Sequence, residues 1–204
     1  MSQPVTTTKS WNDYFKATLN NPPHPMVVKA LDAFERTGRP TGHGLDLGCG
    51  AGRDTRELLR RGWNVLAIDR EPAALYMLRG TVSDDGQTRL TTRVSSFETL
   101  KLMERVDLVN ASYSLPFCQP DHFYELWAEI VMAIRPGGRF SGNFFGIRDA
   151  WAGTPTMTFF DSPKVHALLA PFDVEFFEEV DRQGTTALEG NKHWHVFNVV
   201  ARKR

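Results

Sequence analysis

Apolar residues recur along the chain with helical spacing in some segments and as short continuous runs in others. The clearest helical spacing lies at 121–134, and a second pattern predicts a helix over 25–36. Ser10 is placed to cap a shorter helix over 11–19, which two prolines end, and the polar residues 1–9 precede it. The apolar stripe of the longest helix consists of Phe123, Trp127, Ile130, Val131 and Ile134.

Short apolar runs alternate with the helical segments, and this order predicts an α/β fold with a doubly wound sheet. The polar stretch 83–86 is predicted as a surface loop. The expected strands are 43–47, 63–68, 90–94, 106–110, 139–145, 174–180 and 193–201, the last two forming a hairpin. The expected helices between them are 53–61, 72–79 with Gly80 as its stop, and 162–170.

The segment 43–54 combines a buried strand, a glycine-rich loop and a helix start. Gly48, Gly50 and Gly52 stand at every second position, where the missing Cβ atoms allow positive φ angles and a close approach of the backbone to a ligand. The first N–H groups of the following helix lack partners within the helix and can meet that ligand. The pattern therefore predicts a ligand site at this loop.

Asp69 stands at the end of the second expected strand. In a doubly wound sheet its carboxylate would lie beside the glycine loop and accept hydrogen bonds from both hydroxyls of a ribose. The alternative is that Asp69 caps the helix that begins at Pro72. The distance of one βα unit from the glycine loop favours the ribose role and predicts a nucleoside ligand.

The glycine spacing and Asp46 indicate which nucleoside fits. The dinucleotide fingerprint is G-x-G-x-x-G, whereas the loop here reads G-x-G-x-G and Arg53 stands at the packing position. An acidic residue inside the first strand opposes a pyrophosphate and suits a ligand with positive charge.

At these residues the chain resembles the class I S-adenosylmethionine-dependent methyltransferases, whose first motif is similar to LDLGCGAG at 45–52. The RPGG turn at 135–138 also resembles this family. The resemblance implies a Rossmann-like, seven-stranded sheet with an antiparallel last strand, over 40–204, preceded by a tail and capping helices at 1–39. The loop 146–151 and the segment 192–195 look most like the small tellurite-resistance type.

The resemblance implies S-adenosyl-L-methionine as cofactor and S-adenosyl-L-homocysteine as product. In this family an aspartate commonly follows the third strand and meets the adenine; Ser96 takes that position here, with Phe97 beside it to flank the ring. The cofactor-binding residues expected from the family are Asp46, Gly48, Cys49, Gly50, Gly52, Asp69, Arg70, Ser96, Phe97 and Asn110. Cys49 is expected as a small loop residue rather than a nucleophile.

Substrate-facing residues are expected at the ends of later strands and in the N-terminal helix. They are Tyr14, Tyr113, Phe117, Arg148 and Trp151, although plain packing is an alternative for the aromatic ones. A thiol or chalcogen oxyanion that already carries charge needs no general base; an amine or hydroxyl acceptor would need one, with Tyr14, His193 and His195 as candidates. The two histidines share a face but lack a third ligand in sequence, so no metal is expected.

Composition narrows the class of protein further. Among 204 residues, 24 basic side chains balance 24 acidic ones without a sustained charge run, so we expect neither a nucleic-acid nor a membrane surface. The resemblance to the tellurite-resistance type implies a small-molecule substrate. The two cysteines do not form a disulfide framework, which favours a cytoplasmic protein. The methyl acceptor and the oligomeric state stay open. Two other functions also stay open: a non-catalytic cofactor-binding regulator and an NAD-dependent oxidoreductase.

Overall fold

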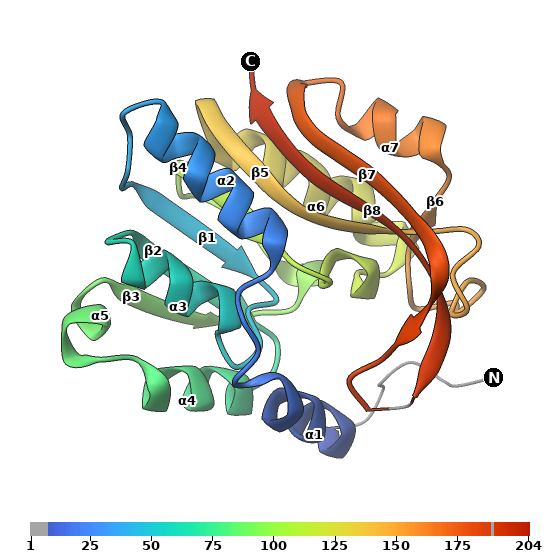
Figure 1. Cartoon of the computed structure of the whole chain (residues 1–204), viewed down its shortest axis with the longest axis horizontal. Helices are drawn as coiled ribbons and strands as arrows, with labels where there is room; N and C mark the ends of the chain where they lie inside the picture. The colour runs from blue at the N-terminus through green and yellow to red at the C-terminus, as the bar shows by residue number, and fades with distance from the viewer. Residues whose placement is uncertain (1–7, 189) are drawn as a thin grey trace.

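The computed structural model describes residues 8–188 and 190–204. Its centre is one mixed sheet in the order β3-β2-β1-β4-β5-β8-β7, with the short β6 paired to β5 (Figure 1). The strands are β1 (His43–Leu47), β2 (Asn64–Asp69), β3 (Leu90–Val94), β4 (Val106–Ala111), β5 (Ile134–Gly146), β6 (Phe159–Phe160), β7 (Phe172–Thr185) and β8 (Asn191–Lys203).

Helices cover both faces of this sheet (Figure 1). Buried residues of α2, α3 and α4 join one core cluster, and those of α6 and α7 join the other. No helix in the described part of the chain is long and apolar enough to span a membrane. The helices are α1 (Thr8–Thr18), α2 (Pro25–Arg36), α3 (Arg53–Arg60), α4 (Pro72–Thr81), α5 (Asp84–Thr88), α6 (Pro120–Ala133) and α7 (Ser162–Leu168), with 3₁₀ turns η1 (Phe97–Thr99) and η2 (Leu115–Phe117).

The strand directions create a crevice at one edge of the sheet. β1 to β5 run parallel, and β8 is antiparallel to both of its neighbours, β5 and β7. β2 and β4 flank β1 on opposite sides, so the strand order reverses there and the following loops diverge. The predicted doubly wound fold with an antiparallel last strand is confirmed; the sheet has eight strands instead of seven because β6 adds to β5.

The alternating side chains of β1 show how the sequence builds the core and the site together. Leu45 and Leu47 are fully buried in the cluster that includes α6 and α7. Each such burial contributes about 1.5–3 kcal/mol. Asp46 points to the opposite face, where Thr55 Oγ1 of α3 donates a hydrogen bond to its carboxylate at 2.5 Å. One polar position in an apolar strand thus brings a carboxylate beneath the glycine loop.

Three local predictions were wrong. The first helix begins at Thr8 rather than after Ser10, and residues 1–7 lie outside the described part of the chain. Gly80 does not end α4, which continues to Thr81. The stretch 83–86 is not an open loop, because the Ser83 hydroxyl accepts a hydrogen bond from the Gly86 N–H and caps the short helix α5.

The last two strands are longer than their apolar patterns predict. β7 and β8 stay paired from Phe172–Lys203 to Thr185–Asn191, although much of β7 is exposed. Alternation of apolar residues stops where one face meets solvent, whereas the backbone ladder continues. The far end of this twisted hairpin reaches toward α1, beside the carboxyl ends of the other strands (Figure 1).

Candidate functional site

A cavity of about 760 Å³ opens at the carboxyl ends of the parallel strands. The glycine loop, the end of β2 and η1 form one part of its wall, and the loop after β4 forms another. α1 and the β7–β8 hairpin close it from two sides. The fold brings half of the predicted cofactor residues and all of the predicted substrate-facing aromatic residues into this one space: Gly48, Gly50, Asp69, Arg70 and Phe97, with Tyr14, Tyr113, Phe117 and Trp151.

Asp69 fixes the glycine loop. Its Oδ2 accepts a hydrogen bond from the Gly50 N–H at 2.8 Å, and its Oδ1 accepts one from the Glu71 N–H at 2.9 Å. The carboxylate is 8% exposed, and burial raises its pKa. Asp69 therefore lies at the loop and in the cavity wall, as the ribose role requires.

The three glycines have different surroundings. Gly48 and Gly50 line the cavity with φ angles of 65° and 53°. A Cβ at Gly50 would come 3.5 Å from the Phe15 ring of α1. Gly52, with φ 84°, lies elsewhere: a Cβ there would overlap the side chain of Leu78 on α4. The third glycine thus permits close packing of two helices instead of facing the cavity.

Behind the loop lies a buried polar network centred on Asn110. Its amide nitrogen donates to Asp46 Oδ1 at 2.9 Å and to Asp54 Oδ2 at 3.1 Å. Asn110 is fully buried and lines neither cavity, and its side chain supports the residues around it. Its carbonyl oxygen in turn accepts a hydrogen bond from Ser141 Oγ at 2.7 Å.

The pKa values of the two aspartates in this network shift in opposite directions. Burial, followed by the neighbouring Asp54 carboxylate, raises the pKa of Asp46 to about 7. Burial also acts on Asp54, but the Arg53 guanidinium, 3.2 Å away, holds the pKa of Asp54 below its ordinary value. Asp46, Arg53 and Asp54 face a side cavity of about 50 Å³ next to the glycine loop. This side cavity offers both a carboxylate pair and a guanidinium to a ligand.

Some of the other predicted cofactor residues line the main cavity, and others lie outside it. Arg70 and Phe97 line the main cavity. Cys49 lines only the side cavity, and burial raises the pKa of its thiol, so the thiol stays protonated. Ser96 does not line the cavity: its hydroxyl lies 3.2 Å from Thr99 Oγ1 within η1, and the preceding Ser95 takes the wall position.

Aromatic residues form much of the remaining wall, and β7 with the following turn adds residues 180 and 182–188. The predicted residues Tyr14, Tyr113, Phe117 and Trp151 all line the cavity, as does Trp11 of α1. Three further aromatic residues were not predicted: Phe15 of α1, Phe145 of β5 and Trp194 of β8.

Tyr113 is held in an unusual backbone conformation. Its φ is 54°, the only positive value at a non-glycine residue in the described chain. The Tyr113 N–H donates to Asn143 Oδ1 of β5 at 3.0 Å, and the Tyr113 ring packs edge-on against Phe145 and Trp194. Such strain costs about 1–3 kcal/mol and persists only where surrounding contacts fix it. The loop after β4 thus presents this ring to the cavity.

Trp151 and Trp194 have a buried cation behind them. Lys192 Nζ lies 3.4 Å from the Trp151 ring centroid and 3.8 Å from that of Trp194. It also donates to Asp149 Oδ1 at 2.5 Å, and both side chains of this pair are almost fully buried. Burial lowers the pKa of Lys192 to about 8. Neither charged residue lines the cavity, so the pair fixes the wall from outside.

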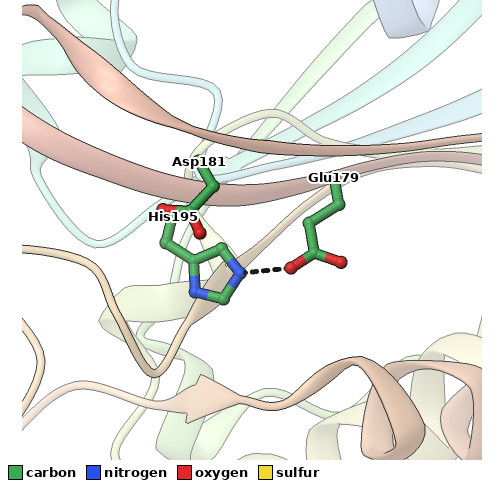
Figure 2. Close-up of side chains that lie close together, drawn as sticks. All are labelled: Glu179, Asp181 and His195. Atoms are coloured by element: carbon green, nitrogen blue, oxygen red, sulfur yellow. Dashed lines mark hydrogen bonds and ion pairs between the residues drawn. The ribbon is translucent and has the colours of Figure 1, made fainter.

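The predicted catalytic histidines and Arg148 lie away from the cavity. His193 Nε2 is 2.6 Å from Asp181 Oδ1. His195 Nε2 is 2.8 Å from Glu179 Oε1 (Figure 2). Side chains alternate along β8, so Trp194 faces the cavity and its two histidine neighbours face the other way. Arg148 pairs with both Glu179 and Asp181 at 2.7 Å.

Figure 2 shows Glu179, Asp181 and His195 close together, a grouping with donor atoms suited to a metal ion. The sequence alone did not predict this grouping, because Glu179 and Asp181 come from β7 whereas His195 comes from β8. The local chemistry is that of an ion-pair cluster, since the Arg148 guanidinium already lies against both carboxylates. The Arg148 backbone N–H donates to His195 Nδ1 at 3.0 Å, and Glu179 Oε1 and Arg148 Nη2 lie 2.8 and 3.1 Å from His195 Nε2. Both ring nitrogens therefore already have partners within the protein.

Comparisons with known proteins agree with this geometry. Residues 45–138 match the family described as a methyltransferase domain. A carboxy-S-adenosyl-L-methionine synthase from Vibrio parahaemolyticus is 27% identical over 126 residues, which are 57% of this chain and 50% of that protein. The chain thus spans about half the length of the curated relatives it matches.

Solved structures resemble the whole fold. TehB from Haemophilus influenzae has a TM-score of 0.76 at 18% identity, covering 95% of this chain and 67% of that one. A 1,6-didemethyltoxoflavin-N1-methyltransferase from Burkholderia thailandensis, with its substrate and S-adenosylhomocysteine bound, has a TM-score of 0.63 at 22% identity, covering 100% and 93%. The match to the methyltransferase domain thus covers just under half of this chain. The fold as a whole is TehB-like and is shared with the solved methyltransferase.

Proposed function

We propose that this protein transfers the methyl group of S-adenosyl-L-methionine to a small-molecule acceptor by in-line displacement. The observation that carries the proposal is the 2.8 Å hydrogen bond between Asp69 and Gly50 at one end of a cavity whose other end is aromatic. A nucleoside site and an acceptor site thereby share one enclosed space. Placing nucleophile and methyl carbon at near-attack distance contributes up to about 7–11 kcal/mol in favourable cases.

The residues present fit this cofactor. Asp69 is placed for the ribose hydroxyls, the backbones of Gly48 and Gly50 for close contact, and Phe97 for the adenine face. The side cavity suits the amino-acid end, with Asp46 and Asp54 toward its ammonium group and Arg53 toward its carboxylate. The cofactor's sulfonium supplies the activated methyl group.

The remaining predicted residues take supporting roles in this proposal. Gly52 packs against Leu78, and Ser96 and Asn110 hold segments whose neighbours line the site. We assign residues 40–204 to the cofactor-binding domain and the segment before it to the cover of the cavity. Of that segment, α1 lines the cavity, whereas α2 packs into the core against the sheet.

The acceptors expected from the sequence, a thiol or a chalcogen oxyanion, need no general base when charged. Among the described histidines none lines the cavity, which agrees with an acceptor of this kind. The test is formation of S-adenosylhomocysteine by purified protein with an acceptor panel that includes small thiols, tellurite and selenite. Acceptor-dependent formation of that product is the expected result. Binding of the cofactor without turnover of any acceptor favours the non-catalytic regulator instead.

A further inference from the structure

The acceptor part of the cavity is a continuous aromatic surface. Trp11 and Phe117 have ring centroids 5.2 Å apart, Phe117 and Trp151 are 6.5 Å apart, and Trp151 and Trp194 are 5.8 Å apart. The rings come from α1, η2, the loop after β5, and β8, so four separate segments converge on it. Tyr113 and Phe145 extend the same surface toward the strand ends.

Two phenol groups in this region are free to bind a ligand. Within residues 8–188 and 190–204, neither the Tyr14 nor the Tyr113 hydroxyl makes a hydrogen bond, and both side chains line the cavity. Burial raises the pKa of each phenol, so both hydroxyls keep their protons at neutral pH and act as donors. A ligand with hydrogen-bond acceptors at its edge would satisfy them.

The carboxylates of the cavity lie apart from this aromatic surface, whereas Arg182 of β7, the cross-strand partner of Trp194, lines the cavity beside it. The lining carboxylates Asp69, Glu71 and Glu98 come from the segments that form the nucleoside side. His24, whose ring packs against Tyr113, does not line the cavity, and burial lowers its pKa to about 4. No described residue among the aromatic rings is therefore a general base for an acceptor.

We infer that the acceptor is a flat aromatic molecule whose nucleophilic atom is unprotonated at neutral pH, such as an aromatic thiolate. This inference rests on the proposed function and names the substrate class of that site. The aromatic thiol loses its proton to solvent before the methyl transfer, because its ring delocalises the charge of the thiolate. The thiolate electron pair then forms the new bond to the methyl carbon. The bond from that carbon to the sulfonium breaks, its electron pair stays on the cofactor sulfur, and the products are an aryl methyl thioether and S-adenosylhomocysteine.

Aromatic walls distinguish ligands of similar size by shape and electron distribution. Stacked and edge-on ring pairs contribute about 0.5–1.5 kcal/mol each beyond the burial of area. A compact oxyanion gains nothing from these walls, since ring faces carry negative charge density. A saturated ring gains burial but not the ring pairing. Benzenethiol and cyclohexanethiol therefore form a pair of probes, and their methyl thioethers, neither of which ionises, are titrated beside them so that ring pairing is separated from charge.

The experiment measures binding of each probe to the full chain saturated with S-adenosylhomocysteine, by calorimetry and by indole fluorescence. We expect benzenethiol to bind at least tenfold more tightly than cyclohexanethiol, and tellurite not to compete. Equal or tighter binding of cyclohexanethiol or tellurite, or no binding of benzenethiol, overturns the inference. Failure of the protein to bind S-adenosylhomocysteine would instead overturn the proposed function.

Two variants test the residues. Trp194→Leu should reduce the tenfold preference for benzenethiol to less than threefold while leaving S-adenosylhomocysteine binding intact. Trp194→Met, which also removes the ring, serves if the leucine variant does not fold. The double change Tyr14→Phe with Tyr113→Phe should weaken binding of 4-methoxybenzenethiol, which carries an ether oxygen as acceptor at its edge, at least fivefold more than binding of benzenethiol. Tyr124→Phe, on the exposed face of α6, is the matched control. Unchanged preferences in both cavity variants overturn the assignment of these walls to the acceptor.

Discussion

Lys192 and Asp149 form a buried ion pair, 2.5 Å apart, directly behind the aromatic wall of the cavity. The Asp149 carboxylate also accepts hydrogen bonds from the backbone N–H groups of Trp151 and His195 at 3.0 and 3.1 Å. One acidic side chain thus joins the loop after β5 to β8. The ammonium group rests on two of the indole rings that this junction positions.

Removing either partner of this pair should have unequal effects. In Asp149→Ala the buried ammonium loses its counter-charge and two backbone N–H groups lose their acceptor, which we expect to cost about 3–5 kcal/mol of unfolding free energy. Lys192→Met removes the cation but leaves Asp149 with its two backbone donors, so its cost should be smaller. Urea denaturation of both variants checks the order. A greater loss in Lys192→Met would contradict this account of the junction.

The lowered pKa of Lys192 predicts a pH dependence of stability. Between about 8 and the ordinary value of 10.5, the unfolded chain binds a proton that the folded chain does not. The contribution of this residue to the unfolding free energy therefore rises with pH across that window. The same deprotonation removes the cation from the indole rings, so tryptophan fluorescence should change with a midpoint near pH 8. Lys192→Met should abolish both effects, and a variant that keeps the fluorescence transition would refute the assignment.

Asp46 predicts the opposite dependence at lower pH. With a folded pKa of about 7 against an ordinary 3.8, the folded chain keeps a proton that the unfolded chain has released. The contribution of Asp46 to stability therefore falls as pH rises through this window. Asp46→Asn should flatten the decline, and its unfolding free energy at pH 7 should equal or exceed that of the natural chain. Denaturation of the natural chain and of Asp46→Asn at pH 5 and pH 7 measures this decline in unfolding free energy. An equal decline in both proteins would contradict its assignment to Asp46.

Substitutions at two glycines of the loop separate the effect of helix packing from the effect of ligand access. Gly52→Ala places a methyl group on Leu78 at a positive φ, so we expect a loss of more than about 1–3 kcal/mol of stability. Gly50→Ala carries similar backbone strain, but its methyl group meets only the Phe15 ring at ordinary contact distance. It should therefore be more stable than Gly52→Ala yet bind the cofactor more weakly, because the methyl group enters the cavity wall. Thermal unfolding and calorimetric titration measure the two properties.

How far the sequence predicts this molecule depends on whether a feature is local. The strand, loop and helix around Gly48 and Gly50 lie within a dozen residues, and Asp69 follows at the next strand end, so their meeting could be predicted. The Lys192–Asp149 pair joins residues that are 43 positions apart, and no local pattern in either segment predicts it.

The two histidines of β8 show a second limit of prediction from sequence. Alternation correctly placed His193 and His195 on one face of a strand, but the pattern does not say which face meets the cavity. Trp194, which lies between them, is the residue that lines the cavity. The available indication of this in the sequence was a large aromatic residue in an otherwise polar stretch. Supports such as Asn110 were assigned to direct contact because strand ends supply both roles.

The central claim is that Asp69 and the glycine loop bind S-adenosylmethionine. Calorimetric titration of the natural chain, Asp69→Ala and the exposed control Glu125→Ala with S-adenosylmethionine, S-adenosylhomocysteine and NAD tests it directly. We predict that the natural chain and Glu125→Ala bind both sulfur compounds and not NAD. Asp69→Ala should lose at least tenfold in affinity, about 1.4 kcal/mol. No binding of either sulfur compound, a preference for NAD, or unchanged affinity in Asp69→Ala would contradict the account.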